Sequence, residues 1–520
     1  METNVKVKKQ KKGFLLKALD SVESVGNALP HPATIFIILS AVIVVASAIA
    51  GSMGLSVSYD MVDQATGTIV ENHVAAQSLL SADGIRYMFT NIISNFTSFF
   101  SLGPVFTIIL CVGVAEGTGF LSAGLRKVAA VTPARLVTSM IVFLGIMSNV
   151  ASSTGYVVLV PLGAIVFMSF GRHPIAGLAA AFAGVSGGWS ANLLIGSNDP
   201  MFAGISTQAA NMLDPNYLVQ PTSNWFFMFA STFLIVALGT FVTEKIVEPR
   251  LGAYKSNEDA VVEDITSSES RGMKFAMASI LVYVAIIGVL VLPQNGILRN
   301  PETGAILSSP FMSSIIPIMG GVFLIPGLFY GIGSGVIKND KDVIDLMVKG
   351  ISGITGFLVL IFFAAQFINW FDYSKLGTIL SVSGARFLEN TGFVGLPLII
   401  CFIVLTSLLN IVIAVDSAKW VLMAPIFVPM FMRLGYSPEL TQLVFRIGDS
   451  CTNVIAPLMP FFALIVAFCQ KYDKKAGVGT LITTMIPYSI AFLIGWSVLF
   501  IAWYLIGLPI GPGAPLFYGA

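Results

Sequence analysis

Two pairs of charged residues lie within apolar segments in the last quarter of the chain, and their side chains are the first candidates for chemistry. They are Asp416, Lys419, Arg446 and Asp449. A charged side chain at the centre of a bilayer costs about 2.5–3.5 kcal/mol on insertion scales, so four unpaired ones would cost on the order of 10 kcal/mol. We therefore expect these residues to pair with one another, to face water, or to bind a ligand.

Each of these charges has a functional and a structural interpretation. The planar guanidinium group of Arg446 suits a carboxylate or sulfonyl group of a substrate. Arg446 could instead form an internal salt bridge with Asp449, which lies three residues further on and shares its helix face. Lys419 has a long apolar stem, so its ammonium group could reach the outer surface of a membrane.

Polar residues with side-chain oxygens gather where the apolar runs are interrupted. Transporters hold Na⁺ with such oxygens and with the backbone carbonyls of unwound helices. Helix capping is the alternative role, because Ser, Thr, Asn and Asp are the preferred capping residues. An intramembrane carboxylate directly before Pro200 is more than a cap requires, so we assign Asp199 a coupling role. The residues are Asn149, Ser152, Ser153, Asn198, Asp199, Ser417 and Asn453.

Three aromatic residues accompany these polar positions. Trp420 and Tyr156 stand just past two equivalent polar clusters, and Trp189 lies in a Gly- and Ser-rich interruption. Their rings could stack on a ligand ring or could serve packing alone.

The composition identifies the class of protein that must position these side chains. Apolar residues make up 56% of the 520 residues and charged residues only 11%, far below the soluble average of about 25% charged. Several apolar runs reach the roughly 20 residues that cross a bilayer, and they lack the alternation of an outer-membrane barrel. With a net charge of +1 and no basic patch, nucleic acid is not expected as a partner. The four cysteines and three histidines show no metal-ligand spacing.

An internal repeat organises the chain. The segment Ser152–Ser186 aligns without a gap on Asp416–Ser450, 264 residues later (416 − 152 = 264). Each copy contains a polar cluster, an apolar run, a Gly-x-x-Pro turn and a helix that ends in Gly and Ser. Paired interruptions in corresponding halves of a membrane chain indicate a transporter's substrate site. Nine positions are identical: Ser153/Ser417, Val157/Val421, Pro161/Pro425, Phe167/Phe431, Met168/Met432, Gly171/Gly435, Pro174/Pro438, Gly184/Gly448 and Ser186/Ser450.

The fold prediction is an all-α polytopic membrane protein with nine transmembrane helices and two opposed re-entrant hairpins, arranged as inverted repeats. Residues 1–31 form a basic amphipathic segment on the cytoplasmic surface, and the positive-inside rule keeps the N-terminus cytoplasmic. The first repeat covers 32–245, a cytoplasmic linker 246–273, and the second repeat 274–520. Residues 57–73 are expected to form a small external β-hairpin. The predicted spans are about 33–53, 88–119, 174–212, 224–244, 275–292, 309–330, 350–370, 438–470 and 480–507, with hairpins at about 133–170 and 393–434.

Two of these spans are expected to be broken helices. The span 174–212 should break at 184–192 and again at 196–200, and the span 438–470 should break at 448–453. Glycine permits such unwinding, and the freed backbone groups need polar or ionic partners.

Several of these motifs resemble the AbgT family of p-aminobenzoyl-glutamate transporters over essentially the whole chain. They are Asp416-Ser417-Ala418-Lys419-Trp420, Arg446-Ile447-Gly448-Asp449-Ser450, Asn453 and Gly196-Ser197-Asn198-Asp199-Pro200. The resemblance implies a homodimeric inner-membrane transporter without catalytic activity. Family members are linked to uptake of p-aminobenzoyl-glutamate and to export of sulfonamide antimetabolites. By similarity, Asp199, Ser417, Trp420, Pro438, Arg446 and Asp449 match positions of the transport path.

Together these arguments predict two overlapping groups of site residues. The substrate-binding group is Asn149, Ser153, Trp189, Asp199, Ser417, Trp420, Pro438, Arg446 and Asp449. The ion-coupling group is Asn149, Ser152, Asn198, Asp199, Asp449 and Asn453. No cofactor is expected apart from Na⁺ or H⁺ as the coupling ion, and a Na⁺ would bind at the hairpin tips.

The expected function is secondary active transport of p-aminobenzoyl-glutamate or related aromatic amides and sulfonamides. A sodium-coupled dicarboxylate symporter on the same scaffold is the nearest alternative. An intramembrane hydrolase is disfavoured, because Ser417 and Lys419 are two residues apart and do not face each other on a helix. A channel fits opposed hairpins less well than alternating access does. The sequence leaves open the coupling ion, its stoichiometry and the direction of transport.

Overall fold

The computed structural model describes most of the chain. It covers residues 30, 32–62, 69–99, 102–130, 132–151, 155–252, 254, 265–306, 309–352 and 355–519. The predicted amphipathic segment 1–31, apart from Pro30, lies outside the described residues, and so do Ser152 and Ser153.

The first half of the chain is helical apart from one pair of strands. In chain order its elements are α2 (Pro32–Ser52), β1 (Ser56–Val62), β2 (Ile69–Ala75), α3 (Ala82–Thr90), α4 (Ile92–Thr97), α5 (Leu102–Gly117), α6 (Phe120–Ala130), η1 (Ala134–Leu136), α7 (Val137–Ser148), η2 (Asn149–Ala151), η3 (Gly155–Leu159), α8 (Val160–Ser169), α9 (Pro174–Phe182), η4 (Ala183–Gly187), α10 (Asn198–Ala210), α11 (Trp225–Val242), η5 (Thr243–Val247) and α12 (Glu248–Leu251).

The second half of the chain, within the described residues, contains helices only. They are α13 (Ser267–Val291), α14 (Pro310–Ser313), α15 (Ile315–Ser334), α16 (Asp340–Ser352), α17 (Thr355–Tyr373), α18 (Leu376–Asn390), α19 (Leu396–Val412), α20 (Asp416–Arg433), α21 (Pro438–Asn453), α22 (Phe462–Tyr472) and α23 (Val478–Ile506).

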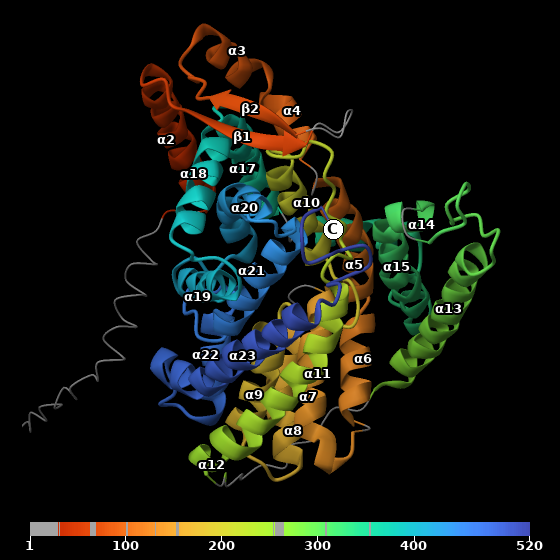
Figure 1. Cartoon of the computed structure of the whole chain (residues 1–520). Helices are drawn as coiled ribbons and strands as arrows, with labels where there is room; N and C mark the ends of the chain where they lie inside the picture. The colour runs from red at the N-terminus through yellow and green to blue at the C-terminus, as the bar shows by residue number, and fades with distance from the viewer. Residues whose placement is uncertain are drawn as a thin grey trace, which may run out of the picture.

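The strands form the expected small hairpin, so the architecture is helical with this one exception among the described residues. β1 and β2 pair antiparallel from Ser56↔Ala75 to Val62↔Ile69. The predicted turn at residues 65–67 lies outside the described residues. The β-hairpin of β1 and β2, together with α3, covers the upper end of the molecule in Figure 1.

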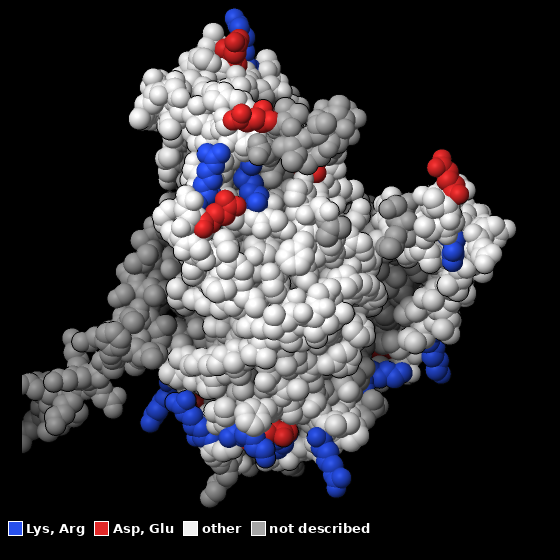
Figure 2. All heavy atoms as spheres, in the orientation of Figure 1, with Lys and Arg blue, Asp and Glu red and all other residues white. Residues whose placement is uncertain are grey.

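Five helices are long and apolar enough to cross a membrane: α2, the α11–α12 segment, α13, α15 and α23. Helices that are apolar on all sides are buried in protein or in lipid, and these helices expose many large apolar side chains. Lys and Arg side chains gather along the lower end of the molecule, below a band without charges (Figure 2). This distribution fits a multi-pass membrane protein.

Several predicted spans differ from the structure. The span predicted at 88–119 is divided among α3, α4 and α5, so it is not one helix. The predicted linker 246–273 is partly helical, because α12 occupies its start and α13 begins at Ser267. A capping box between Thr266 and Glu269 fixes that start. Helices α16 and α18 were not predicted.

The two predicted hairpins are followed by turns of matching local structure. Hairpin 1 pairs α7 with η3 and α8, and hairpin 2 pairs α19 with α20. Each hairpin ends in the repeated Gly-x-x-Pro turn. Gly171 and Gly435 have φ values of +69° and +83°, a conformation that glycine adopts readily. Pro174 and Pro438 then begin α9 and α21, the helix position at which proline's missing N–H costs nothing.

The helices after these turns are interrupted, the first close to its predicted position at 184–192 and the second beyond its predicted position. The first one passes through a π-helical turn at η4, is irregular from residue 188 to 197, and resumes only at Asn198. The second break was predicted at 448–453. That prediction was wrong, because α21 stays helical through Asn453 and the irregular segment is 454–461.

Close packing against a neighbouring helix, rather than unwinding of their own helix, explains the presence of Gly184 and Gly448. A Cβ on Gly448 would lie 2.4 Å from the carbonyl oxygen of Ile403 in α19. A Cβ on its repeat partner Gly184 would lie 2.3 Å from the carbonyl oxygen of Val142 in α7. In both repeats this glycine lets the helix backbone touch the first arm of its hairpin.

The bases of the two hairpins are held by different contacts. At the base of hairpin 1, Arg172 forms an ion pair of 2.5 Å with Glu248 and donates a hydrogen bond to Thr138. At the base of hairpin 2, the last described residues of the chain bind the turn. Ser437 N–H donates to the Leu516 carbonyl at 3.1 Å, and Tyr518 N–H donates to the Gly435 carbonyl at 2.9 Å.

The hairpins and the broken helices form the centre of the molecule. Figure 1 places α20 and α21 in the middle of the view and α7, α8 and α9 below them, while α13, α14 and α15 stand to one side. The main hydrophobic core joins both halves, because it contains residues of α7, α8 and α9 together with residues of α19, α20 and α21.

Candidate functional site

The first element of the site is an ion pair between the two halves of the chain. Arg446 on α21 lies 2.7 Å from a carboxylate oxygen of Asp199 in the first turn of α10, and both side chains are almost fully buried (3% and 4% exposed). The other Asp199 oxygen accepts the Gly196 N–H at 2.6 Å. The Phe202 ring lies 5.1 Å from the guanidinium carbon. Arg446 Nε has no hydrogen-bond partner among the described residues.

A second buried ion pair lies on the same helix. Lys419 on α20 contacts Asp449 on α21 at 2.5 Å, with exposures of 0% and 1%. The Lys419 ammonium group also donates to the side-chain oxygen of Asn410 and, at 3.4 Å, to the carbonyl of Ile413 at the hairpin 2 tip. An ammonium group has three donors. Asn410 and Ile413 accept two of them, and the Asp449 carboxylate supplies the opposite charge while its second oxygen has no hydrogen-bond partner among the described residues.

Asn410 connects this pair to the end of α21. Its amide donates to the Asp449 carbonyl at 2.7 Å, to Thr452 Oγ1 at 3.0 Å and to Asn453 Oδ1 at 2.8 Å. The Asn453 amide in turn donates to the Ser186 carbonyl in η4 at 3.4 Å. The π-helical turn of the first repeat therefore contacts the polar cluster of the second.

Trp420 is held in a chain of hydrogen bonds. Its ring is fully buried and lies 4.4 Å from the Phe445 ring, while its N–H donates to Ser206 Oγ at 3.1 Å. Ser206 donates to Gln442 at 2.7 Å, and Gln442 donates to Asn224 at 2.7 Å. This chain joins α20, α10, α21 and the start of α11.

The hairpin tips meet the first break. The Trp189 indole N–H donates to Asp416 at 2.9 Å, and the Ser417 backbone N–H donates to the other Asp416 oxygen at 2.6 Å. At the tip of hairpin 1, the Asn149 amide donates to the Gly188 carbonyl at 3.3 Å. The Asn149 side-chain oxygen is buried and has no hydrogen-bond partner among the described residues.

Eight of the twelve predicted site residues converge, and four do not or lie outside the described part of the chain. Asn149, Trp189, Asp199, Ser417, Trp420, Arg446, Asp449 and Asn453 lie on the hairpin tips, the breaks and the helices beside them. Pro438 is eight residues before Arg446 on α21, or about 12 Å along the helix axis. Asn198 begins α10 and is only half-buried. Ser152 and Ser153 lie outside the described residues.

The ion pairs differ from the structural alternatives considered for the sequence. Arg446 pairs with Asp199 rather than with Asp449 on its own helix, and Lys419 is buried instead of reaching a membrane surface. Both differences arise because hairpin 2 and α10 bring partners from other helices closer than the neighbouring turn does.

Three contributing residues were missed from sequence, namely Asn410, Ser206 and Gln442, which supply buried hydrogen bonds. Asp416, a candidate from the sequence that was not placed in either group of site residues, accepts from Trp189. The one usable signal for Asn410 was a lone amide in the apolar run of α19.

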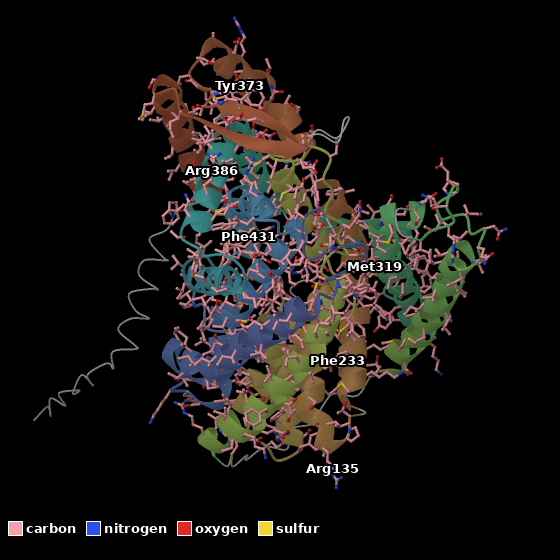
Figure 3. All side chains as sticks on the ribbon, viewed as in Figure 1. Arg135, Phe233, Met319, Tyr373, Arg386 and Phe431 are labelled. Atoms are coloured by element: carbon pink, nitrogen blue, oxygen red, sulfur yellow. The ribbon has the colours of Figure 1, made fainter. Side chains whose placement is uncertain are left out.

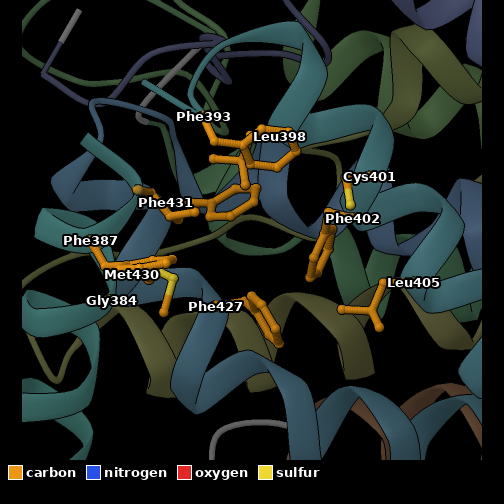
Figure 4. A pocket seen from close by; sticks show the side chains of 11 residues that line it. Gly384, Phe387, Phe393, Leu398, Cys401, Phe402, Leu405, Phe427, Met430 and Phe431 are labelled. Atoms are coloured by element: carbon orange, nitrogen blue, oxygen red, sulfur yellow. The ribbon is translucent and has the colours of Figure 1, made fainter. Parts of the chain in front are cut away.

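Two apolar pockets lie elsewhere. One, of about 300 Å³, is lined by residues of α18, α19 and α20, including Phe402, Phe427 and Phe431 (Figure 4). The other, of about 680 Å³, lies between α13 and α15. Neither is lined by a predicted site residue, and the first has no charged residue in its lining, so the first does not suit a dicarboxylate.

The arrangement can bind an anion and contact an aromatic ring. Arg446 keeps an unused donor beside its carboxylate partner, and the Phe202 ring is close to it. At the hairpin 2 tip, the amide, carbonyl and carboxylate oxygens that would suit Na⁺ already surround the Lys419 ammonium group. The buried side-chain oxygen of Asn149 at the hairpin 1 tip has no donor among the described residues, so it could ligate a Na⁺.

The comparisons with known proteins agree over nearly the whole chain. The AbgT transporter family model matches residues 17–518. The p-aminobenzoyl-glutamate transport protein of Escherichia coli (strain K12) is 39% identical over 492 residues, 95% of each chain.

Two solved structures have the same fold. The YdaH transporter of Alcanivorax borkumensis is 41% identical with a TM-score of 0.87, covering 93% of this chain and 100% of its own. MtrF of Neisseria gonorrhoeae, described with a class of antimetabolite efflux pumps, is 47% identical with a TM-score of 0.90, covering 96% and 100%. Together with the multi-pass helical fold, these matches show that the chain belongs to the AbgT family of membrane transporters.

Proposed function

We propose that this protein is a secondary active transporter that moves p-aminobenzoyl-glutamate, or related aromatic-amide and sulfonamide antimetabolites, across the inner membrane. The observation that carries the proposal is the buried Arg446–Asp199 pair between the two repeats, with a guanidinium nitrogen left free for a substrate carboxylate. The names of the relatives from Escherichia coli and Neisseria gonorrhoeae support the substrate class.

Alternating access is the proposed mechanism, on nine spans and two opposed hairpins in repeats 32–245 and 274–520. The matching turns at Gly171 and Gly435 support the repeat. Opposed entry of the hairpins is supported by two side chains in Figure 3. Arg135, at the start of hairpin 1, lies at the lower end, and Arg386, before hairpin 2, lies in the upper part of the molecule.

The proposed roles follow from the contacts. Arg446 binds a carboxylate of the substrate, and Asp199 exchanges between Arg446 and a coupling ion. Asn149, Ser152, Asn198, Asp449 and Asn453 complete the ion path. Ser153, Trp189, Ser417, Trp420 and Pro438 shape the substrate path. The convergence of eight of these residues on the hairpin tips and breaks supports this assignment.

The proposed assembly is a homodimer in the inner membrane with a cytoplasmic N-terminus and linker 246–273. The basic lower end of the molecule supports that orientation under the positive-inside rule (Figure 2).

Counterflow in liposomes tests the function directly. Liposomes that contain the purified protein and are loaded with unlabelled p-aminobenzoyl-glutamate should accumulate the radiolabelled compound. In a second measurement, a proton gradient and a sodium gradient are imposed separately, and one of them should drive net flux. Protein-free liposomes are the control. Absence of exchange under both gradients would contradict the proposal.

A sodium-coupled dicarboxylate symporter is the rival function on this scaffold, and the named relatives do not favour it. Such a carrier needs no aromatic contact. Sodium-driven succinate flux that survives Trp420→Ala would support it, whereas competition by p-aminobenzoyl-glutamate but not by succinate would exclude it.

A further inference from the structure

Asp416 is the carboxylate of the central cluster that has no cationic partner. The cluster contains three carboxylates (Asp199, Asp416 and Asp449) and two cations (Arg446 and Lys419). Each cation is committed to another carboxylate, at 2.7 Å and 2.5 Å. Asp416 forms no ion pair within the described part of the chain. An uncompensated charge at this depth needs water or a ligand, and Asp416 is partly exposed while Ser417 to Val421 are buried.

The Asp416 carboxylate is held in position by donors from two elements. Trp189 in the first break donates to one oxygen, and the Ser417 backbone donates to the other. Each carboxylate oxygen accepts about two hydrogen bonds. One acceptor direction on each oxygen is therefore left for a donor that the protein does not supply.

Aromatic rings stand beside this carboxylate. Trp189, whose N–H is bonded to Asp416, lies 6.4 Å from the Tyr156 ring. Tyr156 stacks on Phe461 at 4.6 Å with an interplanar angle of 7°. Trp189 and Phe461 are partly exposed, so an acceptor and flat apolar surfaces are presented together. A ligand that suits both is a flat ring with an N–H donor at its edge.

We propose that Asp416 is a specificity-determining residue that accepts a hydrogen bond from the amino group of an arylamine substrate. The inference rests on the proposed function and sharpens it, because the aminobenzene ring is the part common to p-aminobenzoyl-glutamate and the sulfonamides. It also fixes the direction of the bound substrate. Asp416 repels carboxylates, so the glutamate end lies toward Arg446 and the amino end toward Asp416.

Paired ligands that differ only in the amino group test the proposal. Binding of p-aminobenzoyl-glutamate and of benzoyl-glutamate is measured on the purified protein by titration calorimetry. A hydrogen bond to a charged acceptor should make wild-type protein prefer the amino compound by about tenfold or more. Asp416→Ala should bring the two Kd values together. Asp416→Asn, which keeps one acceptor oxygen, should give an intermediate ratio.

Two controls separate recognition from folding. Glu389→Gln removes an exposed carboxylate at the end of α18 and should leave the ratio unchanged. If Asp416→Ala does not fold, Asp416→Asn and Trp189→Phe supply the measurement. Trp189→Phe keeps a ring but removes the donor that orients Asp416, so it should reduce the preference in part.

The outcomes distinguish this inference from the proposed transport function on which it rests. Equal affinity of wild-type protein for both ligands, or an unchanged preference in Asp416→Ala and Asp416→Asn, overturns the arylamine role while transport of p-aminobenzoyl-glutamate stands. Failure of wild-type protein to bind either ligand overturns both proposals.

Discussion

The two buried ion pairs of α21 resemble each other in burial and differ in which group is left without a partner. In the Lys419–Asp449 pair, the ammonium group contacts Asp449, Asn410 and Ile413, and the unpartnered atom is an acceptor, the second carboxylate oxygen (Oδ2) of Asp449. In the Arg446–Asp199 pair, a guanidinium group with five donors keeps Nε unpartnered. Unsatisfied buried polar groups are rare in native proteins and call for an explanation.

This difference shows which group each pair could offer to a ligand. The Lys419–Asp449 pair joins hairpin 2 to α21 and leaves an acceptor open, whereas the Arg446–Asp199 pair joins the two halves of the chain and leaves a donor open. Variants at the two pairs should therefore separate effects on stability from effects on transport.

The largest expected effect is on transport by Arg446→Ala. Truncating one partner of a buried charge pair in a binding site costs about 2–5 kcal/mol, so uptake of p-aminobenzoyl-glutamate into proteoliposomes should fall by at least about thirtyfold. Arg446→Lys keeps the charge but loses the planar fork and should also lose most of the flux. Wild-type flux in purified Arg446→Ala would remove Arg446 from the substrate path.

Lys419→Met should act mainly on stability. Removing one partner of a buried ion pair costs roughly 3–5 kcal/mol, because the other charge stays buried. The midpoint of thermal unfolding in detergent should therefore fall clearly. The double variant Lys419→Met/Asp449→Asn removes both charges and should recover most of the loss. A single variant as stable as the wild type would show that the pair is not structural.

A smaller effect is expected where Trp420 is held by its N–H. Ser206→Ala leaves that buried donor without its acceptor and should cost about 1–3 kcal/mol of unfolding free energy. Trp420→Phe removes the donor and keeps a ring. Measuring both variants and their combination gives the coupling between the two side chains. A raised KM in Trp420→Phe with unchanged stability would favour ring stacking on the substrate over a positioning role.

The smallest effect is expected at a partly exposed pair. Arg172 and Glu248 are 2.5 Å apart with exposures of 20% and 24%, and exposed pairs contribute about 0–1 kcal/mol. Glu248→Gln should shift the unfolding midpoint little, and less at high salt. A loss as large as that of Lys419→Met would mean that the base of hairpin 1 is as tightly coupled as the centre.

The sequence predicted local structure better than it predicted partners. The turns at Gly171 and Gly435, with helices that start at Pro174 and Pro438, follow from glycine and proline stereochemistry and are confirmed. The spacing of Arg446 and Asp449 suggested an ion pair along one helix. Their actual partners come from α10 and α20, because hairpin packing decides which side chains meet.

The prediction of the second helix break was wrong because it misinterpreted the role of a glycine. Gly448 was interpreted as a site of unwinding, yet it permits contact with Ile403 while the helix continues. A single sequence does not distinguish these two uses of glycine. The amphipathic helices α16 and α18 were not predicted because they are short and more polar than a membrane span, so they lack a long apolar run.

The hydrogen bonds between Gly435, Ser437 and the segment 516–518 have a consequence for biogenesis. Arg172 and Glu248 both lie in the first half of the chain, so the contacts at the base of hairpin 1 can form before the second half is translated. The base of hairpin 2 is bound by residues that follow α23, so those contacts can form only after α23 has been translated.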